Sequence, residues 1–476
     1  MSELPFIQEC DSLTDESDLR RNSHASFFSL NWLAFGYAIA YCSDGEYMYL
    51  RMGIMDRFSA GTYAASLAIG GLVGSLLMGF LLKGLMSYKN CQILSCVITV
   101  LGWYFHCLVI LLEDDKHNTA LMVLNFSRFM IGIACGISVH VVPICCSMAS
   151  STRARHIFGL FPPLSFNFGF FLCYIYGWAV IKMDVIALGP SLANTSIPVS
   201  IHQRGITYYP LLGIAISGAG LLFTILFDES YVVRDQDTLV TNRRFDPFIG
   251  QTTTFRDRIA EQCRLLRKPY ILKELALCNI LAIQQMIGIN VIIFNATNLF
   301  QPFFQSKSSD PSSPALIGVM IGFVYLLSIF VVCFLTQKYS RTSVLQTGSV
   351  VMAFCHFVLA LCYLYDQIHS IITPIVCLIF VAAFCCSWGP FPWLVISEVF
   401  DIRIRNFGMT LSSSLMWFSM FMMTMLYAPI VSWINASGVF FLLLAFTIIS
   451  FIYTYLFVPE TKYLTLEEIQ SYFKEL

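Results

Sequence analysis

Residues 281–300, LAIQQMIGINVIIFNATNLF, are long enough to cross a bilayer, yet they carry two glutamines and three asparagines. A membrane span needs about 20 mostly apolar residues, and polar side chains within it are costly unless they face the protein interior. A carboxamide offers two donors and two acceptor lone pairs without carrying charge. The five carboxamides therefore predict an interior site for a neutral, hydroxyl-rich ligand, with interhelical bonding as the alternative.

The spacing of these amides predicts a break in the helix. At about 100° per residue, part of the polarity gathers on one stripe of the helix. The stripe consists of Gln284, Gly288, Asn295 and Asn298. Gln285 and Asn290 fall on opposite flanks, so they share a cavity with the stripe only if the helix unwinds near Gly288, whose backbone tolerates this most readily. A broken span at membrane depth also predicts a buried or water-lined cavity beside it.

The composition of the whole chain excludes a soluble globule. Of the 476 residues 57% are hydrophobic and 12% are charged, and the mean hydropathy is +0.71. Soluble domains carry about 25% charged residues. The 17 cysteines lie mostly in apolar runs without a C-x-x-C pair, which is typical of small buried side chains. The net charge of -1 favours no nucleic acid partner, and we expect no metal or cofactor.

Apolar runs predict the architecture. There are twelve, the first near 27–43 and the last near 436–458. We predict an all-α membrane protein with twelve transmembrane helices in two six-helix halves. The predicted divisions are an N-terminal tail at 1–26, a first half at 27–228, a cytoplasmic linker at 229–270, a second half at 271–458 and a C-terminal tail at 459–476.

Basic residues indicate the orientation, because they resist translocation. With both termini cytoplasmic, 20 of the 28 Lys and Arg residues fall on inner segments and 6 on outer segments. The sequons at Asn194 and Asn435 then lie on outer loops, where glycosylation is expected. The polar first 26 residues lack an apolar signal region, so we expect the first span to act as an uncleaved anchor. FRDRIAEQCRLLRK (255–268) is predicted to form an amphipathic cytoplasmic helix, with a solvated linker as the alternative.

An internal repeat relates the two halves. TRARHIFG (152–159) and DIRIRNFG (401–408) follow corresponding spans, and Arg155 and Arg405 are 250 residues apart. Parallel repeats place a substrate site at the midplane between two rocking halves. Chance similarity of short basic loops is the alternative.

Four ordered segments resemble one family. QQMIGIN (284–290) is similar to the QQ-x-x-G-I-N signature of the sugar porters in the major facilitator superfamily, and WGPFPWLVISEVFDIRIR (388–405) to their G-P-x-P-W segment. VPETKYLTLEEI (458–469) resembles their P-E-T-K-G tail, and SRFMIGIACG (127–136) their fourth span. The resemblance runs from the first span to the tail. It implies the major facilitator fold and transport by alternating access.

The resemblance also implies a substrate site and a gate. The implied substrate-binding residues are Gln284, Gln285, Asn290, Phe294, Asn295, Trp393 and Trp417. Trp393 is expected to close over a ring face of the sugar, since aromatic faces suit the apolar patches of a pyranose; ordinary packing is the alternative for both tryptophans. Pro390 and Pro392 should kink the tenth span.

Charged residues of the inner loops are implied to latch the cytoplasmic side. The implied interhelical salt bridges involve Arg153, Arg155, Glu398, Arg403 and Arg405. Weak ion pairs suffice to bias two nearly equal states. The alternative is that these residues only set the orientation in the membrane, which would explain the arginines but not Glu398.

Departures from the family pattern affect the expected mode of transport. Ala38 stands where proton-coupled relatives have a carboxylate, while its usual partner Arg128 remains. A buried arginine needs pairing or water, and we expect Asp44 or Glu46 to supply it. Pro163 and Tyr325 replace polar residues that usually bind the sugar.

These features together predict a function. We expect a multi-pass protein of the plasma membrane, in contact with lipid, that moves a hexose by passive facilitated diffusion. The alternatives are a proton-coupled carrier, a carrier of a polyol or other small solute, and a sugar sensor that does not transport. An enzyme is not expected, because the sequence has no nucleophile elbow, histidine cluster or metal spacing. Nothing in the sequence sets the oligomeric state.

Overall fold

The computed structural model describes most of the chain. The described residues are 16–51, 54–82, 85–109, 117–149, 160–188, 199–228, 264–294, 313–365, 369–401, 404–462, 464 and 466–475. Every regular element within them is helical, and ten helices are long and apolar enough to cross a membrane. The predicted all-α membrane class is confirmed. The amphipathic helix predicted in the central linker lies largely outside the described residues.

In its described part, the first half consists of seven α-helices and one π-helical segment. They are α2 (Glu16–Ser29), α3 (Asn31–Arg51), α4 (Arg57–Leu77) with its π-helical continuation η2 (Met78–Leu82), α6 (Tyr88–Leu108), α7 (His117–Ala149), α9 (Phe161–Leu188) and α10 (Val199–Leu226). Helix α2 crosses the predicted boundary at 26–27 and packs against α7. Asp44 and Glu46 make α3 more polar than the ten apolar helices.

The helices of the second half are interrupted more often. They are α13 (Pro269–Ala282), the 3-10 helix η5 (Ile283–Ile287), α14 (Ile289–Phe294), α16 (Ser313–Lys338), α17 (Arg341–Leu364), α18 (His369–Cys386), α19 (Phe391–Val399), α20 (Arg405–Phe457) and α21 (Leu466–Glu475). Helix α20 has 53 residues and a non-helical residue, Asn435, with φ 60° and ψ 171°. At about 1.5 Å per residue it is far longer than one hydrocarbon core, so it contains two arms. The count of twelve spans stays a prediction.

Corresponding loops in the two halves begin their helices in the same way. Ser87 caps the start of α6 by accepting from the Asn90 N–H at 3.3 Å, and Ser340 caps α17 by accepting from the Ser343 N–H at 3.3 Å. A serine in this position satisfies one of the free N–H groups of the first turn. The two caps fit the predicted repeat, because both loops follow the second span of their half.

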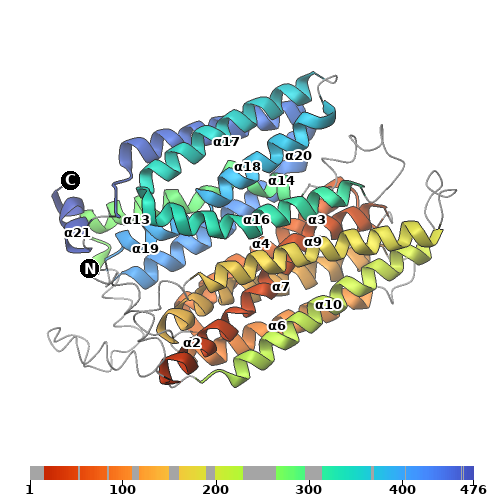
Figure 1. Ribbon diagram of the computed structural model, residues 1–476, viewed down its shortest axis with the longest axis horizontal. Coiled ribbons are helices and arrows are strands. Elements are labelled where there is room, and N and C mark those ends of the chain that lie inside the picture. The colour runs from red at the N-terminus through yellow and green to blue at the C-terminus, as the bar shows by residue number, and fades with distance from the viewer. Residues whose placement is uncertain are drawn as a thin grey trace, which may run out of the picture.

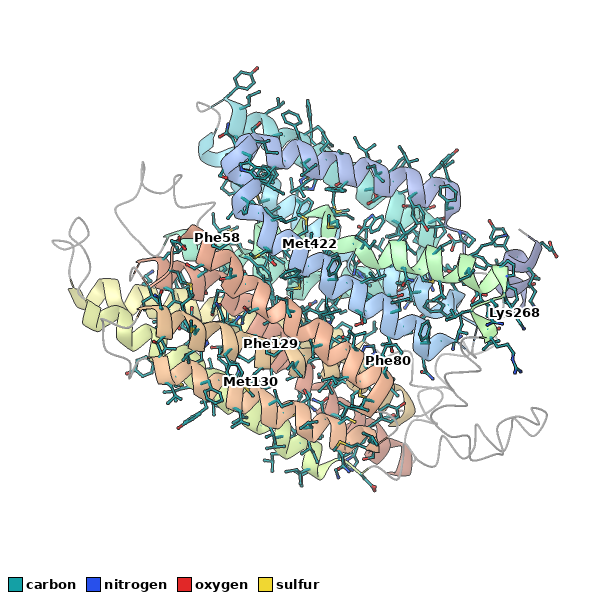
Figure 2. The ribbon with its side chains drawn as sticks, turned by 180° about the vertical axis from the view of Figure 1, so that it is seen from behind. Phe58, Phe80, Phe129, Met130, Lys268 and Met422 are labelled. Carbon is teal, nitrogen blue, oxygen red and sulfur yellow. The ribbon has the colours of Figure 1, made fainter. Side chains whose placement is uncertain are left out.

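The two halves form separate bundles that meet along two seams. Figure 1 shows the first half, from red to yellow-green, beside the second half, from green to blue. One seam joins α4 to α20 and the other joins α9 to α16. In Figure 2, α4 with η2 runs between the labelled Phe58 and Phe80, next to the arm of α20 that carries Met422. The elements α13, η5 and α14, which carry or adjoin the amides, pack against α20.

Candidate functional site

The amide-bearing span is broken at the predicted glycine. Helix α13 ends at Ala282, the next five residues form a 3-10 turn, and Gly288 adopts a left-handed conformation with φ 101° and ψ 16°. The Gly288 N–H donates to the Gln285 carbonyl at 3.2 Å, which closes the turn. Glycine is the residue that adopts this conformation without steric cost. The predicted unwinding near Gly288 is confirmed.

The break brings together amides that an ideal helix would separate. Asn290 Nδ2 donates to Gln285 Oε1 at 2.8 Å, across the left-handed glycine. Gln284 and Asn290 are only 3% and 5% exposed. In the amide orientation that satisfies both of its groups, Gln284 Oε1 accepts from Trp393 Nε1 at 2.9 Å and Gln284 Nε2 donates to the Trp388 carbonyl. Every contact in this set is made by uncharged groups.

Trp393 reaches Gln284 because the predicted proline-rich break is present. Helix α18 ends at Cys386, a turn follows, and α19 starts after Pro390 with Pro392 in its first turn. Prolines are tolerated there because first-turn N–H groups lack helical partners. Trp388, within the turn, donates from Nε1 to Ser349 Oγ at 2.7 Å and to the Leu345 carbonyl at 3.1 Å. It anchors the turn to α17, a role that the sequence analysis missed.

Trp417 lies on the seam between the halves with an unused donor. Its indole, 1% exposed, packs on Gly71 of α4, where any Cβ would collide with the ring. The ring centroid of Phe35 is 5.9 Å away. The Trp417 Nε1 is buried and has no hydrogen-bond partner among the described residues. An unsatisfied buried donor costs about 1–3 kcal/mol, so this N–H is available to a ligand.

The other predicted substrate residues are only partly described. Phe294 ends α14 and is buried, and the adjacent Ile293 carbonyl accepts from the Tyr174 hydroxyl of α9 at 3.3 Å. This bond connects the amide-bearing span to the opposite half. Asn295 lies outside the described residues.

The cavities of the described part of the molecule include the following two. One, of about 380 Å³, is apolar and lies between the two arms of α20 and the residues Ile283 and Met286 of η5. The other, of about 20 Å³, lies within the first half. Neither is lined by Gln284, Gln285 or Asn290. The predicted water-lined chamber is therefore neither of these cavities, and in this arrangement the amides bond to protein groups.

Arg128 has a partner that was not among those expected. It is fully buried, its Nη1 donates to the Ala38 carbonyl at 2.8 Å, and its guanidinium carbon lies 5.2 Å from the centre of the Tyr63 ring. Asp44 accepts from the Tyr209 hydroxyl at 3.0 Å. Among the described residues Arg128 Nε and Nη2 have no hydrogen-bond partner, and its pairing with Asp44 or Glu46 stays an expectation. The partners that the structure gives Arg128 are the backbone oxygen of Ala38 and an aromatic face.

The charges predicted to lie on the cytoplasmic side form contacts within the second half. Glu398 Oε1 pairs with Arg341 Nη2 at 3.1 Å, and Glu398 Oε2 accepts from the Thr461 hydroxyl. Arg405 Nη2 donates to the Phe400 carbonyl at 3.3 Å. Arg153, Arg155 and Arg403 lie outside the described residues. The structure thus gives Glu398 a partner, Arg341, that was not among the predicted gating residues.

Of the two sequon asparagines, only Asn435 lies within the described residues. Asn435 is exposed at the bend of α20, where a glycan would have room. Asn194 lies outside the described residues. Glycosylation at both positions stays a prediction.

Comparison with known proteins agrees with this geometry. The family model described as "Sugar (and other) transporter" matches residues 25–473. Facilitated glucose transporter member 8 of solute carrier family 2, from Mus musculus, is 26% identical, and the alignment covers 96% of this chain and 95% of that protein. The glucose transporter GlcP of Staphylococcus epidermidis is 25% identical, with 96% of this chain and 98% of that protein covered.

Solved structures share the fold. The crystal structure of a D-xylose-proton symporter has a TM-score of 0.72 at 19% identity, covering 93% of this chain and 98% of that chain. A proton:xylose symporter of the major facilitator superfamily bound to 6-bromo-6-deoxy-D-glucose has a TM-score of 0.71 at 19% identity, covering 96% of this chain and 100% of that chain.

The two helical bundles have the major facilitator fold, and the match to the sugar transporter model makes this chain a membrane transporter. Such proteins carry solutes and are not enzymes. This chain belongs to the sugar transporter family, whose model matches it from α2 to α21.

Proposed function

We propose that this protein is a passive carrier that moves a hexose across the membrane by alternating access. The observation that carries the proposal is the amide cluster of Gln284, Gln285 and Asn290 at the Gly288 break. A carboxamide can donate to a sugar hydroxyl or accept from it. The cluster has no charge to hold an ionic substrate, and two relatives are named as glucose transporters.

The hydrogen bonds that the amide cluster makes to protein groups are ones that a sugar can replace. Hydroxyl groups would take over the bonds that now join Asn290 to Gln285 and Trp393 to Gln284. The unused N–H of Trp417 adds a donor that needs no rearrangement. An affinity near 1 mM requires only about 4 kcal/mol, which a few net hydrogen bonds supply.

The surroundings of Arg128 support the passive mode. Proton-coupled transport needs a group that binds and releases a proton during the cycle. The Arg128 guanidinium meets the carbonyl of Ala38, and a backbone carbonyl does not titrate. We therefore propose that flux follows the sugar gradient alone.

The cytoplasmic side supplies the gate in this proposal. Glu398, already paired with Arg341, would also engage Arg153, Arg155, Arg403 and Arg405 as the halves close on the inner side. We place the protein in the plasma membrane with both termini cytoplasmic. Helices α2 and α21 lie toward the same end of the molecule in Figure 1, which supports termini on one side.

The test is reconstituted flux with a panel of radiolabelled hexoses, pentoses and polyols. We expect saturable hexose uptake that a protonophore leaves unchanged, and we expect Gln285→Ala to reduce it at least tenfold. Uptake that collapses when the pH gradient is discharged would refute the passive mode. Preferential uptake of a polyol would show that the substrate is a polyol and not a hexose. Sugar binding without flux would favour a sensor.

A further inference from the structure

A buried histidine on a neighbouring helix forms a hydrogen bond with the backbone of the broken span. His356 lies on α17, is 0% exposed, and its Nε2 is 3.0 Å from the carbonyl oxygen of Ile287. A carbonyl only accepts, so Nε2 carries the proton and donates. The ring is held by Phe380, with centroids 4.6 Å apart, and by Phe440, with centroids 6.2 Å apart.

The carbonyl that His356 binds is one that the break leaves in need of a donor. In an unbroken helix the Ile287 carbonyl would accept from the N–H of Val291, four residues later. The Val291 N–H is instead directed to the Gly288 carbonyl at 3.1 Å. Freed backbone groups at membrane depth must be satisfied by neighbouring protein. The His356 side chain supplies the donor from a neighbouring helix.

We propose that His356 is a positioning residue of the substrate site, which fixes the break at Gly288 and thereby the directions of Gln284, Gln285 and Asn290. Ile287 lies between the two glutamines and the glycine, so the bond acts on the turn that carries them. The role in transport rests on the proposed function, whereas the role in holding the turn does not.

The environment of His356 favours a specific donor over general packing. Its Nδ1 is buried and has no hydrogen-bond partner within the described part of the chain. A phenylalanine would fill the same aromatic site without an unsatisfied nitrogen, which costs free energy in a buried position. The polar ring therefore has one contact that a hydrocarbon ring lacks, the bond to Ile287. Ionisable residues within spans are functional candidates by default, and that signal was available in the sequence.

Three substitutions separate donation from packing. His356→Phe keeps a ring and removes the donor. His356→Gln places an amide nitrogen close to the position of Nε2, whereas the shorter side chain in His356→Asn places it nearer to Nδ1. Ser437→Ala is the matched control, since Ser437 Oγ of α20 donates to the Ala360 carbonyl of the same helix α17 at 2.9 Å.

Two readouts test the proposal. In hydrogen–deuterium exchange of the full protein without sugar, we expect His356→Phe to exchange at least tenfold faster over residues 284–291, with no such change in Ser437→Ala. In proteoliposomes we expect the hexose KM of His356→Phe to rise about tenfold with a smaller change in kcat. His356→Gln should restore both values to within about threefold of the parent protein.

The exchange readout does not depend on the substrate, so it keeps this proposal separate from the proposed function. If the parent protein carries no hexose, the proposed function fails while the exchange comparison still decides the role of His356. The proposal is overturned if His356→Phe behaves like Ser437→Ala in exchange, or if His356→Gln is as impaired as His356→Phe. Should His356→Phe not fold, His356→Asn replaces it with the same expectations.

Discussion

Gly288 decides where the polar side chains of the seventh predicted span point. Its φ of 101° turns the chain between Gln285 and Asn290, so that their amides meet at 2.8 Å. Without that turn the two side chains would lie on opposite flanks of a helix. One backbone conformation therefore converts an apolar helix into a polar site.

Substituting Gly288 tests this directly. We expect Gly288→Ala to reduce hexose uptake about 5- to 30-fold, because a left-handed non-glycine residue costs about 1–2 kcal/mol. The new Cβ would also lie 2.7 Å from Leu443 Cδ1. The matched control is Gly218→Ala in α10, where an added Cβ meets no atom within 4 Å. Uptake and thermal melting of both variants check the prediction, and equal activity would contradict it.

The unused indole N–H of Trp417 gives a second prediction at the residue scale. We expect Trp417→Phe to raise the KM for hexose about 2- to 12-fold, since a net hydrogen bond is worth about 0.5–1.5 kcal/mol. The phenyl ring would still pack on Gly71. Trp103→Phe is the control, because Trp103 Nε1 is also buried without a partner in the part of the chain that the structure describes, but lies in the first half. An unchanged KM in Trp417→Phe would remove Trp417 from the site.

At the scale of elements, the tail that follows α20 secures the start of α17. Glu460 accepts from the Arg341 N–H at 3.0 Å and from the Thr342 N–H at 3.1 Å, which are free donors of the first turn. Partial burial raises the pKa of Glu460, but the N–H donors of Arg341, Lys462 and Thr342 outweigh it, and the pKa lies below 4.5. The ionised carboxylate thus acts as a cap supplied from another element.

This cap predicts a dependence of stability on pH. A lowered pKa in the folded state means that the contribution of Glu460 is fully present above about pH 4.5 and is lost as the pH falls through the folded pKa. We expect Glu460→Gln to lower stability by about 0.5–2 kcal/mol near neutral pH, as for other lost caps. Melting curves between pH 3 and 7 should show a flatter profile for this variant. The exposed Glu475→Gln is the control, and identical profiles would contradict the assignment.

At the scale of the whole molecule, the seams determine whether the halves can rock. Ser75 Oγ of α4 lies 3.2 Å from Ser413 Oγ of α20. Helices α9 and α16 meet at the other seam, where Asn167 Nδ2 donates to the Tyr325 carbonyl at 2.7 Å. In the proposed mechanism, a sugar would reach Gln284 and Asn290 when contacts of this kind part on one side.

A crosslink across the first seam tests that requirement. The Oγ atoms of the serine pair are 3.2 Å apart, which makes Ser75→Cys, Ser413→Cys the pair of choice for a disulfide across this seam. We expect the oxidised double variant to retain under about 10% of parental uptake and to recover when reduced. Each single variant, treated identically, controls for the native cysteines. Normal uptake by protein that mass spectrometry shows to be fully crosslinked would contradict rocking about this seam.

The sequence was sufficient for features set by local chemistry. The carboxamide pattern and Gly288 predicted the broken span, and the proline pair predicted the division between α18 and α19. It did not predict which side chains meet across helices, because that depends on register and tilt. Arg341 as the partner of Glu398, His356 at the Ile287 carbonyl and Ala38 as the acceptor for Arg128 all required the three-dimensional structure.

The central claim is that a neutral amide cluster binds a hexose and is exposed in turn to each side of the membrane. Tracer counterflow in proteoliposomes tests it most directly: vesicles loaded with unlabelled hexose are diluted into a trace of labelled hexose, with a protonophore present. We predict a transient accumulation of label above equilibrium, which is abolished in Gln285→Ala and unaffected in Gly218→Ala. The account would be contradicted if the label only reached equilibrium across the membrane. It would also be contradicted if the Gln285→Ala variant accumulated label as the parent protein does.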